Sequence, residues 1–422
     1  MRPDDLIHFC APARLVLGCG SRHQLPDLIH RLGWRHGVLV TDGFFTGQTT
    51  WVRELVDACS ARDIRMAVFD DGIPDPTTTL CDRATARLAA VHRMDPFDHV
   101  ISLGGGSNID LAKALCLTIP TGAPIVRFVG GIGKVRPLPL VAIPTTAGTG
   151  SEATPGAILV DPDNATKVAV MDNALRPQLA LIDPELTFTC PPRVTADTGI
   201  DAFTHAVESF LAIDSAGFDR AGNIDPGYSG RSSITMLFAR ESIRLCIDWL
   251  AKAYRNGQDR QARVGMSYAS VYAALSYGSA GLHAAHGIAY AVAARTHKSH
   301  GSTNAVVLPY VLDELRIARR TELLEVARLW GASGSDDAAV KAVPRLVREL
   351  VARLDIPTNL RDFGVTEESL DALVADALAV SRLAQAYPGP DVAAAYRRIV
   401  RRAFDGRLAS DADGARLSTL TT

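Results

Sequence analysis

The sequence has few features of disulfide frameworks, membrane proteins or nucleic-acid-binding proteins. Its seven cysteines, scattered from Cys10 to Cys246, form no CxxC pair, which argues against a disulfide framework and favours a reducing compartment. The N-terminal segment MRPDDLIHFC carries acidic residues early, which argues against a signal peptide. No apolar run approaches the ~20 residues that a membrane helix needs. A net charge of −2 without a cationic stripe gives no support for a nucleic-acid partner. We therefore expect a cytoplasmic protein without a membrane or nucleic-acid partner.

The 422 residues are enough for two domains, and the pattern changes once along the chain. Apolar strand patterns alternate with helical spacing in the first part, with strands expected at 36–42, 65–72, 99–107, 139–146 and 179–184. This alternation predicts a parallel sheet covered on both faces, with a hairpin at 157–162 and 166–171. Helical periods dominate after Pro192, apart from a polar loop at 214–230. We predict an α/β domain over 1–188 and an all-α domain over 189–422.

A glycine-rich turn, GGGSNIDLAKA, begins at Gly104 directly after a strand pattern and before a helical one. Glycines allow close approach of an anion, and the helix N-terminus offers free N–H groups, so the turn suits a pyrophosphate. Ser107 followed by Asp110 resembles a capping box. The spacing does not match GxGxxG or GxxxxGK[ST], so a purely structural turn is the alternative.

Two other segments favour a dinucleotide. Asp42 ends the first strand of the alternating region, where a carboxylate accepts ribose hydroxyls and repels a 2′-phosphate, which favours NAD over NADP. A helix N-cap is the alternative role for Asp42. The segment PTTAGTGSEAT at 144–154 places hydroxyls and glycines after a strand, as expected for phosphate, ribose or nicotinamide contacts. An ordinary polar loop is the alternative.

Histidines cluster in the second half of the chain. Four of the eleven lie within residues 283–301, and Asp201 and His205 are four apart, which places them on one face of a helix. A carboxylate and imidazoles suit a divalent metal, whereas a surface hydrogen bond is the plainer role of an Asp/His pair alone. His286 and His300 would lie about 21 Å apart on one straight helix, so a shared ion requires the helix to end between them. Spacing leaves the choice among the four histidines open.

These motifs, in this order, resemble the iron-containing (group III) alcohol dehydrogenases along nearly the whole chain. The resemblance rests on VTD at 40–42, PDPT at 74–77, GGGSNIDLAKA, PTTAGTGSE, IDPELT at 182–187, TGIDAFTHAVES at 198–209 and AHGIAY…HKSHGSTNAVVLP. It implies a Rossmann-like N-terminal domain, an all-helical C-terminal domain, a cleft that holds cofactor and metal, and a homodimer or larger assembly.

The resemblance also implies roles for residues. Metal ligands would be Asp201, His205, His286 and His300, with Fe(II) or Zn(II) as the ion. Contacts to NAD would fall on Asp42, Pro74, Gly104, Gly105, Gly106, Ser107, Asp110, Thr145, Thr146, Thr149, Ser151 and Lys167. Lys167 would lie near the ribose or nicotinamide and is also a catalytic candidate.

Departures from the family pattern concern the proton relay and the substrate. Tyr290 stands where some members carry a histidine, so His297 is the better relay candidate, with a structural role as its alternative. Arg295 and Lys298 could hold a substrate carboxylate or phosphonate, unless they are surface cations. The long loop at 214–230 and the HAAH pattern resemble the branch containing hydroxyacid–oxoacid transhydrogenase.

The resemblance thus predicts a metal-assisted hydride transfer between a small alcohol, neutral or anionic, and NAD. The metal would lower the pKa of the alcohol, and the nicotinamide would take the hydride. A hydroxyacid–oxoacid transhydrogenase and a non-redox enzyme like dehydroquinate synthase, which also combines NAD with a metal, are the alternatives. A binding protein without catalysis is a third class, which the near-complete motif set disfavours.

Overall fold

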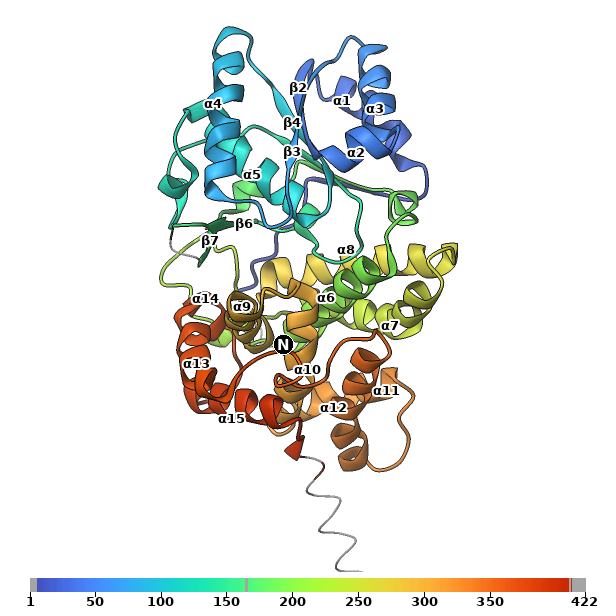
Figure 1. Cartoon of the computed structure of the whole chain (residues 1–422), viewed down its shortest axis with the longest axis vertical. Helices are drawn as coiled ribbons and strands as arrows, with labels where there is room; N and C mark the ends of the chain where they lie inside the picture. Colours follow the sequence, from blue (N-terminus) through green and yellow to red (C-terminus); the bar gives the residue numbers. More distant parts are fainter. Residues whose placement is uncertain (1–5, 164–165, 410, 412–422) are drawn as a thin grey trace, which may run out of the picture. The chain divides into compact units, whose positions relative to one another are not determined.

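The computed structural model describes residues 6–163, 166–409 and 411, which fold as two compact units (Figure 1). The α/β unit contains residues 10–190 together with 225–227. The helical unit contains residues 191–224 and the chain from Tyr228 onward, with a short N-terminal segment that ends at Phe9. The predicted parallel α/β region followed by a helical region is therefore confirmed.

The α/β unit is built on a six-stranded parallel sheet with the strand order β1-β8-β5-β4-β2-β3. Its strands are β1 (Arg14–Leu17), β2 (His36–Asp42), β3 (Arg65–Gly72), β4 (His99–Gly104), β5 (Leu140–Pro144) and β8 (Leu179–Ile182). The central strands are buried on both faces, which explains their continuous apolar sequence. The sequence patterns found every strand except β1, whose four residues RLVL are too short to show alternation.

Helices cover both faces of this sheet (Figure 1). The core on one face includes Leu80 and Leu111 from α4 (Thr78–Met94) and α5 (Gly106–Thr121). The core on the other face includes Ile29 and Cys59 from α1 (Leu25–Arg31) and α3 (Trp51–Ser60), and the short α2 (Gly43–Gln48) follows β2. This two-sided burial holds the carboxyl ends of the strands at one edge, where the glycine-rich turn begins.

A separate antiparallel hairpin is formed by β6 (Gly156–Asp161) and β7 (Thr166–Met171), as the sequence predicted. Val160 donates its backbone N–H to the carbonyl of Pro76 at 2.9 Å. The hairpin is therefore attached to the loop that precedes α4, and this contact positions Lys167 of β7 near that loop.

The helical unit is organised around α6 (Pro192–Leu211), which packs against α7, α8 and α10. Its other helices are α7 (Ser233–Arg255), α8 (Arg260–Ala280), α9 (Ala284–Thr296), α10 (His300–Glu314), α11 (Arg320–Leu329), α12 (Asp336–Ala352), α13 (Leu370–Ala379), α14 (Ser381–Ala384) and α15 (Val392–Asp405). Because α9 ends at Thr296 and α10 begins at His300, the predicted break between His286 and His300 is confirmed.

Within the described residues, none of the helices combines the length and the apolar character required to cross a bilayer. The predicted loop at 214–230 contains one short 3-10 turn, Ser215–Gly217. Its two ends are held together because Ser215 donates its N–H to Arg231 at 2.9 Å and Arg231 donates to Ile213 at 2.8 Å.

Candidate metal centre and dinucleotide site

The metal centre is built on α6, where a helical turn brings Asp201 and His205 onto one buried face. Both residues are only 3% exposed. Oδ1 of Asp201 lies 3.7 Å from Nε2 of His205. The imidazole of His205 is fixed between the rings of Tyr277 and His286, whose centroids are 4.1 and 4.7 Å away.

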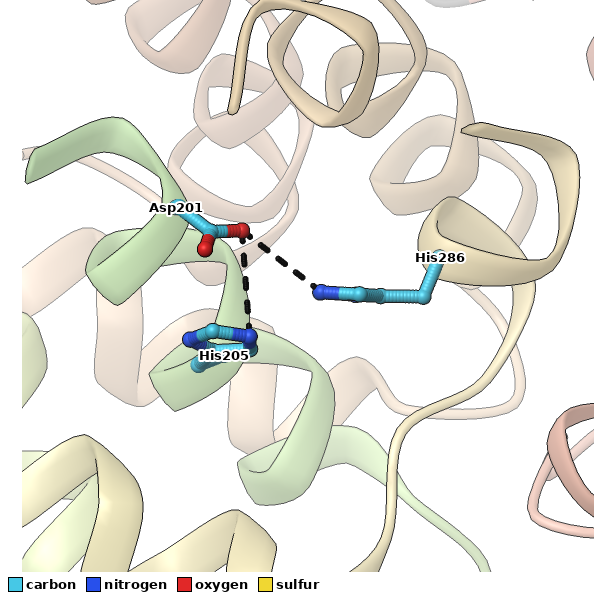
Figure 2. Close-up of side chains that lie close together, drawn as sticks. All are labelled: Asp201, His205 and His286. Atoms are coloured by element: carbon cyan, nitrogen blue, oxygen red, sulfur yellow. Dashed lines mark ion pairs between the residues drawn. The ribbon is translucent and has the colours of Figure 1, made fainter. Parts of the chain in front are cut away.

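Two further imidazoles approach the same carboxylate oxygen from α9 and α10. Nε2 of His286 lies 3.6 Å and Nε2 of His300 3.7 Å from Oδ1 of Asp201. Figure 2 shows His286 pointing from α9 toward the Asp201–His205 pair on α6. Tetrahedral coordination at bond lengths of ~2.1 Å places ligand atoms roughly 3.4 Å apart. Asp201, His205 and His286 therefore converge at a spacing that fits a divalent cation, and His300, the fourth ligand that the family resemblance implies, lies within 3.7 Å of the shared carboxylate oxygen.

Charge favours a cation in this cluster. Burial alone would raise the pKa of Asp201, but the imidazoles of His205, His300 and His286 hold it well below its usual range. Burial would lower the pKa of His286, yet its bonds to Asp201 and Glu208 raise that pKa to about 10. The surroundings thus stabilise positive charge beside an ionised carboxylate, and one oxygen with three imidazole nitrogens suits Fe(II) or Zn(II).

Glu208, which the sequence reasoning missed, holds α9 in place from α6. Its buried carboxylate accepts hydrogen bonds from the backbone N–H of Ala285 at 2.6 Å and from Nδ1 of His286 at 2.6 Å. The first bond caps the N-terminus of α9, and the second directs Nε2 of His286 toward Asp201. The only sequence signal was the spacing of seven residues from Asp201, two helical turns along the same face.

Asp197, one turn before Asp201, holds the beginning of α10. Its Oδ1 accepts hydrogen bonds from the hydroxyls of Ser299, at 2.8 Å, and Ser302. Gly301 packs so closely that a Cβ there would lie 1.8 Å from the carbonyl oxygen of Asp197. Ser299 therefore contributes a side-chain bond that fixes the beginning of α10, where His300 lies.

Asn304, also missed from the sequence, lies one turn after His300 on α10. Its Nδ2 is 2.9 Å from Oδ1 of Asp201, 3.1 Å from Nε2 of His286 and 3.2 Å from Nε2 of His300. The amide nitrogen thus stands at hydrogen-bond distance from three of the four ligand atoms. The position of this amide nitrogen marks a point among the ligand atoms where a hydrogen-bond donor or a cation is favoured.

The remaining histidine candidates take different positions. His283 is fully buried, with Nδ1 3.1 Å from the carboxylate of Glu208 rather than beside Asp201. His297, the relay candidate, is exposed and ends α9 in a left-handed conformation with φ of 52°. The ring of Tyr290 packs on His300 with centroids 5.5 Å apart. Tyr290 therefore adjoins the metal centre, while the relay role of His297 stays a prediction.

The two cationic side chains that were predicted to bind the substrate, Arg295 and Lys298, differ in their surroundings. Arg295 donates to Asp376 at 2.7 Å and to the carbonyl of Ala291 at 2.9 Å. Lys298 is exposed after the end of α9. The guanidinium of Arg295 thus has a counter-charge within the chain, and binding of a substrate by either residue stays a prediction.

In the α/β unit, β4 runs into the glycine-rich turn and α5 begins at Gly106. The prediction of a capping box at Ser107 and Asp110 is wrong, because Gly105 is the N-cap of α5 and no side chain caps the helix. Gly104 has φ of 151°, and a Cβ there would meet the amide of Asn108 at 2.1 Å. At Gly106 a Cβ would lie 2.7 Å from the hydroxyl of Thr149. The turn therefore requires glycine and leaves its backbone uncovered by a Cβ, as a phosphate cradle needs.

Asp42 takes the role that was the alternative to ribose binding. It is the N-cap of α2, with Oδ1 accepting from the N–H of Phe44 at 2.9 Å. Its Oδ2 accepts from Nδ2 of Asn108 at 2.7 Å, which joins the end of β2 to α5. Contact with a ribose would add to these bonds, and it stays a prediction.

Asp110 and Ser151 belong to a buried network with Lys113, which the sequence reasoning missed. The hydroxyl of Ser151 donates to Asp110 and accepts from Nζ of Lys113 at 3.0 Å. Lys113 also donates to the carbonyls of Thr154 and Gly156, both at 2.8 Å. Burial lowers the pKa of Lys113 to about 8. The network fixes the PTTAGTGSE segment on α5, so Asp110 and Ser151 support the shape of the turn.

The other predicted cofactor residues surround this turn. Thr145 is buried and donates its N–H to Gly104 at 3.0 Å, and Thr146 lies against Gly105. Asp75 accepts from Nζ of Lys167 at 2.9 Å and donates its own N–H to the hydroxyl of Ser107 at 3.2 Å. The exposed Pro74 precedes Asp75. Residues predicted from four separate segments thus lie around one βα turn.

Two family profiles match the two parts of the chain, one over the α/β unit with its glycine-rich turn and one over most of the helical unit. The profile of the family described as iron-containing alcohol dehydrogenase matches residues 12–184. The profile described as Fe-containing alcohol dehydrogenase family, C-terminal, matches residues 228–399. The chain therefore belongs to the iron-containing alcohol dehydrogenase family and is an oxidoreductase of the alcohol dehydrogenase type.

Individual relatives are similar over nearly the whole chain. Long-chain-alcohol dehydrogenase 1 of Geobacillus thermodenitrificans is 34% identical over 399 residues, covering 93% of this chain and 95% of its own. 4-hydroxybutyrate dehydrogenase of Cupriavidus necator is 32% identical, covering 92% and 97%. The crystal structure of sulfoacetaldehyde reductase from Bifidobacterium kashiwanohense in complex with NAD+ has a TM-score of 0.81 at 26% identity, covering 94% and 98%.

Proposed function

We propose that this chain is an NAD-linked alcohol dehydrogenase that depends on a divalent metal held by Asp201, His205, His286 and His300. The observation that carries the proposal is the convergence of three imidazole nitrogens within 3.6–3.7 Å of one buried carboxylate oxygen. A bound divalent cation supplies Lewis acidity at an alcohol or carbonyl oxygen, and the nicotinamide carries the hydride. Fe(II) is the ion that we propose first, and Zn(II) is compatible with the same donors.

The reaction that we propose converts an alcohol and NAD+ into the aldehyde or ketone, NADH and a proton. The carbinol carbon gives up hydride as its hydroxyl gives up the proton, so electrons and charge balance. In this chain Glu208 orients His286 through a hydrogen bond at Nδ1, and burial of Asp201, His205 and His286 limits the access of bulk water to these three ligands. The exposed imidazole of His297 is our candidate for passing the proton to solvent.

Three features support NAD as the dinucleotide. The β4–α5 turn has the glycines that a pyrophosphate needs, and the structural relative described above was crystallised with NAD+. Asp42 keeps a carboxylate at the end of β2, where it would repel a 2′-phosphate. We therefore expect NADH to be used in preference to NADPH.

The relatives suggest two kinds of substrate. One is named for long-chain alcohols, whereas the other two are named for 4-hydroxybutyrate and sulfoacetaldehyde, which are anions. We propose a small alcohol or aldehyde, neutral or anionic, as the substrate. The transhydrogenase branch stays a prediction, as do a homodimeric or larger assembly and a cytoplasmic location.

The test is NADH-linked turnover by purified protein loaded anaerobically with Fe(II) or Zn(II). We expect NADH oxidation with short aldehydes, lower activity with NADPH, and loss of activity in His286→Ala. A matched control is His92→Ala, which removes a histidine on α4 of the α/β unit. Undiminished turnover by His286→Ala, or turnover that needs no metal, would contradict the proposed function.

A further inference from the structure

Arg382 is a partly buried cation without a carboxylate partner among the described residues. It lies on α14, the short helix Ser381–Ala384. Its Nε is buried and has no hydrogen-bond partner among the described residues, and its Nη2 donates one long bond of 3.4 Å to the hydroxyl of Tyr290. Within the described part of the chain, no Asp or Glu lies at ion-pair distance from this guanidinium. Its counter-charge is therefore absent from its own surroundings.

Arg231, a buried arginine of the same helical unit, is neutralised by two carboxylates. Arg231, only 7% exposed, pairs with Asp214 at 2.8 Å and with Glu322 at 2.6 Å. The guanidinium of Arg382 instead stands over the ring of Tyr290, 5.7 Å from its centroid. A cation–π contact offsets only part of the cost of removing a cation from water. An anion from outside the chain would offset the rest and would satisfy Nε.

The position of Arg382 connects this cation to the metal centre. Tyr290 lies on α9, one turn after His286, and its ring packs on His300 at 5.5 Å. The same ring carries the guanidinium of Arg382 on α14, which packs against α9. A single aromatic side chain thus separates an unpaired cation from a candidate metal ligand, a separation that a short-chain molecule can span.

We propose that Arg382 binds the anionic end of the substrate, so that the preferred alcohol is a short ω-hydroxy acid bearing a carboxylate or a sulfonate. The planar guanidinium matches the paired oxygens of either group. The inference rests on the proposed function, since it assigns the substrate class of the same site. It gives Arg382 the role that the sequence suggested for Arg295 and Lys298; the guanidinium of Arg295 already has Asp376 as its partner.

The test compares an acid and a neutral aldehyde of similar size in the metal-loaded enzyme. Arg382→Met is expected to lower kcat/KM for succinic semialdehyde by about 10- to 100-fold, the loss of a charge-assisted hydrogen bond, and to change kcat/KM for butanal little. For Arg382→Lys, we expect a kcat/KM for succinic semialdehyde between those of the wild type and Arg382→Met. Sulfoacetaldehyde in place of succinic semialdehyde shows which anion is preferred. The matched control, Arg295→Met, removes a paired guanidinium and is expected to leave the acid preference intact.

Three results would overturn the role of Arg382 in binding the substrate anion. Equal loss for both aldehydes in Arg382→Met, with unchanged metal content and near-UV circular dichroism, would overturn the inference and make Arg382 structural. Loss of the acid preference in Arg295→Met alone would do the same. Turnover of butanal without preference for the acid in the wild type would overturn the inference and leave the proposed function standing.

A binding measurement separates the two proposals if neither aldehyde turns over. In that case the proposed function fails, and the anion site is tested by calorimetric titration of the metal-loaded protein with succinate. We expect at least about tenfold weaker binding in Arg382→Met than in the wild type and in Arg295→Met. Equal affinity in the three proteins, or no binding to any, would overturn the inference.

Discussion

Glu208 on α6 accepts a 2.6 Å hydrogen bond from Nδ1 of His286 on α9. A carboxylate that is 78 residues away in the sequence therefore sets the direction of a candidate metal ligand. Burial would raise the pKa of Glu208, but His283 and His286 hold it below its usual range, so the carboxylate is ionised at neutral pH. A ligand imidazole that donates to a carboxylate becomes a stronger donor to metal.

Glu208→Gln should therefore weaken metal binding without removing a ligand. We expect the affinity for Zn(II) to fall about 10- to 100-fold, the usual effect of losing such a partner. Competition with a chelator of known affinity measures this change. Glu368→Gln, at an exposed position of the same unit, is the matched control and should leave the affinity unchanged. Unaltered affinity in Glu208→Gln would show that Glu208 only caps α9.

Gly301→Ala should displace the beginning of α10. A Cβ at 1.8 Å from the carbonyl oxygen of Asp197 meets backbone, which cannot move aside as a side chain can. We expect a loss of about 1–3 kcal/mol in the free energy of unfolding, as for other overpacked sites, together with a displaced His300 and reduced metal content. Differential scanning calorimetry and metal analysis check both effects. In the control, Gly217→Ala, the nearest atoms are 3.5 Å away and stability should hold.

Gly106→Ala should separate the two candidate sites. The added Cβ would lie 2.7 Å from the hydroxyl of Thr149 and disturb the β4–α5 turn, far along the chain from the metal ligands. We expect the Kd for NADH, measured by fluorescence titration, to rise about tenfold or more, and the metal content to stay at the wild-type level. Gly43→Ala, where a Cβ meets nothing within 4 Å, is the control. Wild-type affinity in Gly106→Ala would place the dinucleotide elsewhere.

Glu152 should make stability depend on pH in the α/β unit. Its side chain is buried, and burial raises its pKa from 4.5 to about 7. Between these values the folded state keeps a proton that the unfolded state has lost, so stability falls as pH rises from about 4.5 to about 7. The loss amounts to roughly 3 kcal/mol at 1.36 kcal/mol per pKa unit.

The pH series can be checked by substitution. Glu152→Gln removes the titration, so its melting temperature relative to wild type should increase from pH 5 to pH 8. Glu368→Gln, exposed, should show a constant difference over the same range. A difference that is independent of pH in Glu152→Gln would mean that Glu152 does not titrate in this window.

Local patterns were sufficient to predict most of the fold. Buried strands such as β2 and β4 read as continuous apolar runs, and the i,i+4 spacing placed Asp201 beside His205. Spacing also required the break between α9 and α10. β1 was missed because its four residues are defined by pairing with β8, near residue 180, rather than by their own pattern.

Residues that act through long-range contacts could not be found in this way. Asn304 lies 103 residues from Asp201, and Arg382 lies 92 residues from Tyr290. Nothing in the local sequence of either marks its partner. Asp42 shows the opposite case, since its position suggested a ribose contact while the structure gives its carboxylate two bonds within the protein.

The central claim is that Asp201, His205, His286 and His300 together hold one divalent ion that turnover requires. The most direct test is metal titration of protein freed of metal by chelation, with bound metal and NADH-linked turnover measured on the same samples. We predict that both rise together and saturate at about one Fe(II) or Zn(II) per chain, and that Asp201→Ala and His286→Ala neither bind the ion tightly nor gain activity. Full turnover without metal, or tight stoichiometric binding in both variants, would contradict the account.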